Sequence, residues 1–270
     1  MKVSKYNGLG NDFVVIKDKV SLDYPSLSKE LCSEENFDTD GFISVKENPL
    51  EMIFYNKDGS RASMCGNGIR CFAKYVLDEG IEEKLSFPVQ TLAGEMFIQV
   101  QEKEPFSCTV NMGVATFSPE KLFAKTDEEI IKKTIQLSNS EVEITSCFIG
   151  TIHTVVLVED ALAELEKNTG EEICHHPLFE QQTNVNFVQI LNEKEILVRT
   201  FERGVGWTLA CGTGCCASVI VAKRFGLVDK HSPITVHLEK GTLEISGEKE
   251  IYMTGPAEFE YEKEYKLPNE

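Results

Sequence analysis

Short apolar runs alternate with turn residues along most of this chain, a pattern typical of β-strands. Alternating or β-branched apolar side chains predict strands at residues 13–16, 51–55, 95–100, 108–110, 154–158, 186–190, 195–201, 234–238 and 242–245. Helical spacing is clearest in two places. Apolar residues repeat at helical intervals over 69–76, before Gly80, and residues 215–225 are apolar almost all round, before Gly226. The pattern therefore predicts a strand-rich chain with two buried helices.

Weaker patterns add two further helices and a crossing point. Helices are predicted at residues 26–33 and 127–136, the second with Thr126 or Asp127 as its N-cap. Residues 113–120 are the best candidate for the crossing between two halves of the chain. The end of the chain is expected to be a charged tail with scattered aromatic residues, over 258–265.

Composition narrows the class of protein. The chain has 270 residues, of which 41% are hydrophobic, enough for one large domain or two ordinary ones. Its net charge of −17 argues against nucleic acid or an anionic membrane as a partner. The first residues lack an apolar signal core, and no apolar run approaches the roughly 18 residues of a membrane span. Nine cysteines in such a chain indicate reduced thiols. We expect a cytoplasmic protein.

A short motif occurs twice. Met-Cys-Gly-Asn-Gly at 64–68 matches Ala-Cys-Gly-Thr-Gly at 210–214, and each motif precedes one of the two clearest helices. The likeness extends outward, because a polar side chain, Asn56 or Glu202, stands nine residues before each motif cysteine. The chain therefore carries a duplicated unit with a cysteine at each predicted helix start.

A cysteine at a helix start can serve as an acid or a base. Helix N-termini lower a thiol pKa from about 8.5 to roughly 3.5–7.5, so one member of the pair can ionise at neutral pH. If Cys65 and Cys211 face one another, one thiolate can take a proton from a carbon while the other thiol protonates the opposite face. Free backbone N–H groups could hold a substrate carboxylate and stabilise the charge that develops. These N–H groups belong to Gly66, Asn67, Gly212 and Thr213. Such chemistry requires neither metal nor pyridoxal.

Several motifs in order give the chain a specific resemblance. They are Gly-Leu-Gly-Asn-Asp-Phe at 8–13, Asn-Lys-Asp-Gly-Ser at 56–60 leading to 65–71, Thr-Asn-Val-Asn-Phe at 183–187, and Phe-Glu-Arg-Gly at 201–204 leading to 211–214. Together they resemble the diaminopimelate epimerase family over nearly the whole length. The resemblance implies a cofactor-independent isomerase that interconverts LL- and meso-diaminopimelate, in lysine and peptidoglycan precursor biosynthesis.

The resemblance also implies a fold and a domain division. The expected fold is α+β, with two pseudo-symmetric domains that each curl a mixed, mostly antiparallel sheet around a central helix. We expect residues 1–113 with 257–270 to form the domain of Cys65. Residues 114–256 would form the domain of Cys211, with the active site in the cleft between the two. The expected partner is a small amino-acid substrate, and the oligomeric state stays open, a homodimer being one candidate.

Residue roles follow from the same resemblance. Cys65 and Cys211 would be the acid/base pair, and Asn11 with the amides after both cysteines would hold the reacting end of the substrate. The distal amino-acid group would be read by Asn56, Asn184, Glu202 and Arg203. An anion and a cation suit this role, because the distal group carries an ammonium and a carboxylate, and Arg203 can offer a bidentate fork.

Two segments depart from the family pattern. Gly-Thr-Ile-His at 150–153 stands where Gly-Asn-Pro-His is common, so the hydroxyl of Thr151 replaces an amide. Asp-Thr-Asp-Gly at 38–41 is a looser match to the usual Gly-Ala-Asp. Neither change touches the cysteine pair, but the first could alter substrate choice at the distal pocket.

Other readings stay open. A proline or hydroxyproline racemase would have Asp-Arg-Ser-Pro before the second motif and a histidine after the first Cys-Gly, where this chain has Glu202, Arg203 and Asn67. A racemase of another amino acid on the same scaffold is harder to exclude. A thiol redox or binding protein is a different class, which entry of solvent isotope at a substrate Cα would distinguish. A zinc site is disfavoured, because the cysteines lack paired C-x-x-C spacing. His153 is either structural or a pocket residue. The other cysteines are expected to be packing residues: Cys32, Cys71, Cys108, Cys147, Cys174, Cys215 and Cys216.

Overall fold

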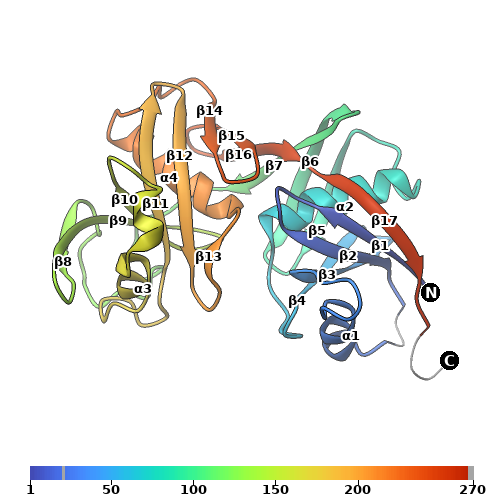
Figure 1. Ribbon diagram of the computed structural model, residues 1–270. Coiled ribbons are helices and arrows are strands. Elements are labelled where there is room, and N and C mark those ends of the chain that lie inside the picture. The colour runs from blue at the N-terminus through green and yellow to red at the C-terminus, as the bar shows by residue number, and fades with distance from the viewer. Residues whose placement is uncertain (20–21, 267–270) are drawn as a thin grey trace. The chain divides into compact units, whose positions relative to one another are not determined.

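The computed structural model describes residues 1–19 and 22–266 (Figure 1). The chain divides into two compact units. Unit 1 comprises Met1–Val110 and Gly255–Glu270, and unit 2 comprises Asn111–Thr254. Among the described helices, none is long and apolar enough to cross a membrane.

Unit 1 builds a mixed sheet. Its elements are β1 (Lys2–Asn7), β2 (Asp12–Lys17), α1 (Tyr24–Leu31), β3 (Gly41–Lys46), β4 (Glu51–Asn56), α2 (Gly66–Asp78), β5 (Ser86–Thr91), β6 (Gly94–Lys103), β7 (Phe106–Gly113) and β17 (Glu258–Glu264). Strand β2 runs antiparallel to β1 and parallel to β3, and β4 runs antiparallel to β3 and parallel to β5. Strands β5, β6 and β7 then pair antiparallel in sequence.

Unit 2 repeats this plan. Its elements are β8 (Lys133–Gln136), β9 (Glu141–Ile149), β10 (Thr151–Leu157), the 3₁₀ turn η1 (Ala163–Glu166), α3 (Thr169–Cys174), β11 (Asn184–Asn192), β12 (Glu195–Glu202), β13 (Gly206–Thr208), α4 (Gly212–Arg224), β14 (Ile234–His237), β15 (Thr242–Ser246) and β16 (Ile251–Pro256). Strands β9, β10, β11, β12, β14, β15 and β16 pair with the same succession of directions as β1 to β7. The predicted α+β fold with two pseudo-symmetric units is confirmed.

The two motif helices are each the buried helix of their unit. Helix α2 packs against β1, β2, β3 and β17, and α4 packs against strands β9 to β12 with β14 and β15. Ile69, Phe72 and Val76 are all fully buried, as their spacing predicted. Gly80 and Gly226 follow the helix ends with φ of 64° and 67°, in the left-handed region that glycine adopts without strain. Both predicted helix stops are therefore confirmed.

Most other sequence predictions of local structure also hold. Each of the nine predicted strands lies within or overlaps an observed strand. The helix predicted at 26–33 is α1, which begins earlier because Pro25 occupies its first turn, where a missing N–H costs nothing.

The helix predicted at 127–136 is wrong. Residues 133–136 form β8, which pairs antiparallel with β9 so that Ile135 lies opposite Val142. Thr126 Oγ1 does accept the backbone N–H of Glu128 at 3.2 Å, as an N-cap residue would, but no helix follows it. The β-branched residues of this segment fit a helical spacing and a strand equally well, and the pairing with β9 decides between them.

The segment predicted as a charged tail is also more ordered than expected. Residues 258–264 form β17, which pairs antiparallel with β1 at the opposite end of the sequence (Figure 1). Phe259 packs edge-on against Tyr6, and Tyr261 stacks with Phe37. The alternation of aromatic and charged residues was the strand signal in this segment.

Candidate active site

Cys65 is the N-cap residue of α2. Its backbone is extended, with φ −135° and ψ 120°, and its Sγ accepts the N–H of Gly68 at 3.4 Å. A Cβ atom on Gly68 would lie 3.3 Å from the Cβ of Cys65, so the glycine permits this close start of the helix. Cys65 is half-buried. Its thiol therefore sits at the positive end of a helix with partial access to solvent.

Cys211 takes the same place in α4. Its backbone is also extended, with φ −124° and ψ 106°, and its Sγ lies 3.6 Å from Thr213 Oγ1. A Cβ atom on Gly214 would lie 2.3 Å from Asn186 Oδ1 and 3.3 Å from Cys211 Sγ. Only glycine fits at position 214 without displacing one of these groups. Cys211 itself is 6% exposed.

The surroundings of Cys211 act on its pKa in opposite directions. Burial raises the pKa of the Cys211 thiol well above its ordinary value, and the negative charge of Glu202 adds to the rise. Hydrogen bonds from Thr213 and the Gly214 N–H offset part of this rise. At Cys211, desolvation therefore outweighs the effect of the helix start, which by itself would lower the thiol pKa.

Asn11 and Asn67 meet beside the first motif. The turn that carries Asn11 packs on the first turn of α2, where a Cβ on Gly8 would lie 3.1 Å from the Asn67 carbonyl oxygen. Asn67 Nδ2 donates to Asn11 Oδ1 at 2.5 Å, and the Arg70 guanidinium donates to Asn67 Oδ1 at 3.2 Å. Arg70 is fully buried and also donates to the Gly66 carbonyl at 2.9 Å. Unit 1 therefore brings together Asn11, Gly66 and Asn67 at the helix start of Cys65.

Asn56 lies at the end of β4. Its Nδ2 donates to Ser60 Oγ at 2.9 Å, and its backbone N–H donates to the Ser60 carbonyl at 2.9 Å. The side chain thus closes its own turn, in which Gly59 has a φ of 82°.

Asn184, Glu202 and Arg203 gather at one end of the β11 and β12 pair. The register that sets Val185 opposite Phe201 also places Asn184 beside Glu202. Asn184 Oδ1 accepts the backbone N–H of Arg203 at 3.0 Å, and Glu202 Oε1 accepts the Thr208 hydroxyl at 2.7 Å. Unit 2 therefore brings these three residues together, with Glu202 close enough to raise the pKa of Cys211.

The Arg203 guanidinium is held by oxygens of its own unit. It donates to the Gln181 carbonyl at 2.9 Å and to Thr151 Oγ1 at 3.4 Å. Thr151 is the residue that departs from the family pattern. Its hydroxyl oxygen accepts a hydrogen bond from Arg203, so Thr151 helps to hold the guanidinium in place.

His153 is a buried neutral histidine. It is fully buried, and burial together with the positive charge of Arg203 lowers its pKa to about 3. Asn186 Oδ1 accepts the Thr200 hydroxyl at 3.1 Å, which turns Asn186 Nδ2 toward His153 Nδ1 at 3.2 Å. His153 Nε2 then carries the proton, and among the described residues it has no hydrogen-bond partner.

The remaining cysteines are packing residues, as predicted. Seven of them are buried: Cys32, Cys71, Cys108, Cys147, Cys174, Cys215 and Cys216. Burial raises the pKa of Cys108 and of Cys147 to about 12. Within 1–19 and 22–266, no group of three or more His, Cys, Asp or Glu side chains is arranged to hold a metal ion.

Sequence reasoning did not single out Arg70, Asp40 or Asn186 as parts of the site. Arg70 had a usable signal, because it is a cation on an otherwise apolar helix next to the first motif. Asp40 lies in the 38–41 segment that resembles a family motif, but its hydrogen bonds to residues 28 to 29 positions away are revealed by no local pattern.

Solved structures place this fold in a known class. The chain aligns with a Bacillus anthracis phenazine biosynthesis protein of the PhzF family at a TM-score of 0.74 and 18% identity, over 99% of both chains. It also aligns with a probable proline racemase from Agrobacterium radiobacter at 0.73 and 14%, over 98% of this chain and 93% of the other. The protein thus has the two-unit fold that these proteins share.

Sequence comparison then gives the family. The diaminopimelate epimerase family model matches residues 3–118 and 145–260. Diaminopimelate epimerase of Clostridium perfringens is 41% identical over 96% of this chain and 97% of that protein. That of Alkaliphilus metalliredigens is 38% identical over 95% and 94%. The chain belongs to the diaminopimelate epimerase family.

Proposed function

We propose that this protein is an isomerase that interconverts LL- and meso-diaminopimelate, in lysine and peptidoglycan precursor biosynthesis in the cytoplasm. The observation that carries the proposal is the full-length match to curated diaminopimelate epimerases, in a chain with a cysteine at the start of both buried helices. No cofactor enters the proposed reaction, because two thiols supply both the proton acceptor and the proton donor.

In the proposed reaction the two cysteines act on opposite faces of one carbon. The Cys65 thiolate removes the proton from the substrate Cα, and the Cys211 thiol delivers its proton to the other face, which inverts the centre. Afterwards Cys65 is the thiol and Cys211 the thiolate, so the reverse reaction starts from this state. Support for this resting assignment comes from burial, which raises the pKa of Cys211, and from the greater solvent access of Cys65. The pair would titrate as a coupled unit.

Backbone amides would stabilise the charge on the reacting carboxylate. Deprotonation at Cα spreads further negative charge onto that group, and fixed N–H donors at helix starts act where this charge develops. The proposed donors are the N–H groups of Gly66, Asn67, Gly212 and Thr213, with the side chain of Asn11.

Recognition of the distal amino-acid group is assigned to Asn56, Asn184, Glu202 and Arg203. Glu202 would accept the distal ammonium, and Arg203 would hold the distal carboxylate. Support comes from the way Asn184 fixes the Arg203 backbone while Thr151 and Gln181 hold its guanidinium. A substrate without the far end would leave these groups unpaired, so it would be rejected.

The deciding experiment follows proton exchange at Cα by NMR. Reduced protein is incubated with LL-diaminopimelate in heavy water, with nothing else added. We expect deuterium at Cα together with formation of the meso isomer. Exchange with another amino acid but not with diaminopimelate would keep the thiol mechanism and overturn the substrate. Absence of exchange with every amino acid would favour a thiol redox or binding protein.

A further inference from the structure

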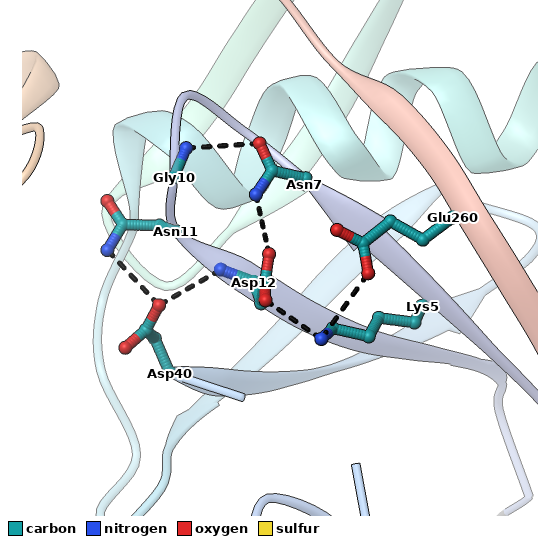
Figure 2. Close-up of polar contacts among 7 residues, drawn as sticks. All are labelled: Lys5, Asn7, Gly10, Asn11, Asp12, Asp40 and Glu260. Atoms are coloured by element: carbon teal, nitrogen blue, oxygen red, sulfur yellow. Dashed lines mark hydrogen bonds and ion pairs between the residues drawn. The ribbon is translucent and has the colours of Figure 1, made fainter. Parts of the chain in front are cut away.

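A chain of side-chain amides links a buried cation to an acidic side chain in unit 1. Arg70 donates to Asn67 Oδ1 at 3.2 Å, and Asn67 Nδ2 donates to Asn11 Oδ1 at 2.5 Å. Asn11 Nδ2 then donates to Asp40 Oδ2 at 3.2 Å (Figure 2). Every link of this chain runs in the same direction, from donor to acceptor.

The two ends of the chain fix this direction. A guanidinium can only donate hydrogen bonds, and a carboxylate can only accept them. Each asparagine between them could by itself point either way, because its oxygen and nitrogen have nearly the same shape. With Arg70 at one end and Asp40 at the other, only one orientation of both amides pairs a donor with an acceptor at all three links. The ends therefore decide which way Asn67 and Asn11 present their N–H groups.

Asp40 is itself held in place. The same Oδ2 atom accepts the backbone N–H of Asp12 at 2.9 Å, and Asp12 is bound by Lys5 at 2.8 Å and by Asn7 Nδ2 at 2.6 Å (Figure 2). Lys5 in turn pairs with Glu260 of β17 at 3.3 Å. The acceptor end of the chain thus rests on three strands, β1, β2 and β17, which is the kind of support that keeps a binding group in one geometry.

We propose that Asp40 is a positioning residue for substrate binding, which fixes the orientation of the Asn11 amide through the bond to Asn11 Nδ2. The inference rests on the proposed role of Asn11 at the reacting carboxylate. Asp40 contacts no substrate. It prevents the Asn11 amide from flipping, because a flipped amide would place the side-chain oxygen of Asn11 against the carboxylate oxygen of Asp40.

The test compares three variants of the full-length protein. Asp40→Ala removes the acceptor, whereas Asp40→Asn keeps an oxygen acceptor of the same shape, which the Asp12 N–H would hold toward Asn11 Nδ2. Asp160→Ala is the matched control, since Asp160 also accepts two N–H groups, those of Leu162 at 2.9 Å and Ala163 at 3.2 Å, at an exposed position. For each variant kcat, KM and the melting temperature are measured with LL-diaminopimelate.

We expect Asp40→Ala to lower kcat/KM by about 10- to 100-fold, the size expected for a lost hydrogen bond to a charged group. Asp40→Asn should stay within about threefold of the unmodified protein, and Asp160→Ala should change the melting temperature only. A folded Asp40→Ala protein with unchanged kcat/KM would overturn the proposal. So would a loss in Asp40→Asn as large as that in Asp40→Ala, because it would mean that the charge of Asp40 acts and the direction of the bond does not.

A second readout needs no turnover. The Asn11 side-chain NH₂ signals are identified in ¹H–¹⁵N spectra of substrate-free protein by their loss in Asn11→Asp. These signals should shift in Asp40→Ala and stay unchanged in Asp160→Ala, and an unchanged signal in Asp40→Ala would overturn the proposal. If the unmodified protein does not epimerise diaminopimelate, the proposed function fails, while the spectra still decide whether Asp40 holds Asn11.

An exchange of the two side chains covers the case in which Asp40→Ala does not fold. Asn11→Asp combined with Asp40→Asn keeps an acceptor for Asn67 and for the Asp12 N–H but reverses the bond between positions 11 and 40. This protein should fold and melt like the unmodified one, yet position 11 no longer offers an N–H to the substrate. We expect its kcat/KM to fall by at least about tenfold, and full activity would overturn the proposal.

Discussion

The two motif helices begin with the same residue in the same backbone conformation, but their surroundings differ. Both thiols accept a backbone N–H of their own helix, but Cys65 is half-buried, whereas Cys211 is 6% exposed and has Glu202 near it. A duplicated sequence motif has therefore produced two chemically distinct thiols. In the proposed reaction, which needs one proton acceptor and one proton donor, this difference is the basis for assigning the starting role of each cysteine.

Removal of either thiol tests the proposed roles of Cys65 and Cys211 and has the largest expected effect. Cys65→Ser and Cys211→Ser should each lower epimerisation by roughly 10²- to 10⁴-fold, since a serine hydroxyl is a far weaker acid and base than a thiol in these positions. Turnover is measured by conversion of LL- to meso-diaminopimelate.

The control for both variants is Cys108→Ala. Cys108 is a fully buried core residue of unit 1, so its loss should lower the melting temperature and leave kcat unchanged. Near-normal turnover in either serine variant would remove that cysteine from the acid/base pair.

The pH dependence of alkylation measures the difference in reactivity between Cys65 and Cys211. Because burial raises the pKa of Cys211, its thiolate fraction is small at pH 7.5 and rises about tenfold per pH unit. Its reaction with iodoacetamide should therefore keep accelerating above pH 8.5, where a thiol of ordinary pKa levels off. Cys65 should react at least about tenfold faster than Cys211 at pH 7.5, because it is more accessible.

Peptide mass spectrometry of the modified protein measures both rates. Cys147, whose pKa burial raises to about 12, provides the reference for a fully buried thiol of unit 2. If the Cys211 rate levelled off near pH 8, the resting assignment of the two cysteines would be reversed or lost.

Local sequence pattern predicted the two motif helices and nine of the 17 strands among the described residues, and it did not predict others such as β3 and β9. Gly80 and Gly226 marked both helix ends because glycine adopts their positive φ values without strain. The sequence pattern gave a wrong prediction at 127–136. The spacing around Ile135 also fits a helix, and only the pairing of Ile135 with Val142 shows that the segment contains a strand. That pairing is a tertiary contact, and no window of sequence contains it.

For the candidate site too, the sequence predicted which residues to consider but not the environment that packing gives them. Duplication and order of motifs predicted that Cys65 and Cys211 stand at helix starts, and both are N-cap residues in the structure. The raised pKa of Cys211 was not predictable, since a helix start lowers a thiol pKa and only the packed structure shows that burial outweighs it. The contact of Asp40 with Asn11 was not predicted for a related reason, because this hydrogen bond joins residues that are far apart in the chain.

The smallest expected effect comes from the glycine three residues after each cysteine. At Gly214 an added Cβ would lie 2.3 Å from Asn186 Oδ1, whereas at Gly68 its nearest neighbours are at 3.3 Å. Gly214→Ala should therefore destabilise the protein by about 1–3 kcal/mol, the usual cost of overpacking. Gly68→Ala should stay within about 1 kcal/mol, because alanine favours a helix by a similar amount.

Denaturant unfolding of the two variants measures this difference, because each substitution adds the same methyl group at the same place in its helix. Gly214→Ala should also slow turnover more than Gly68→Ala, since Asn186 and the Cys211 Sγ share the space that the methyl group would enter. Equal stability losses in the two variants would mean that α4 moves away from Asn186 at little cost. The tight packing around Cys211 would then be adjustable, and burial would hold its proton less firmly than the comparison with Cys65 requires.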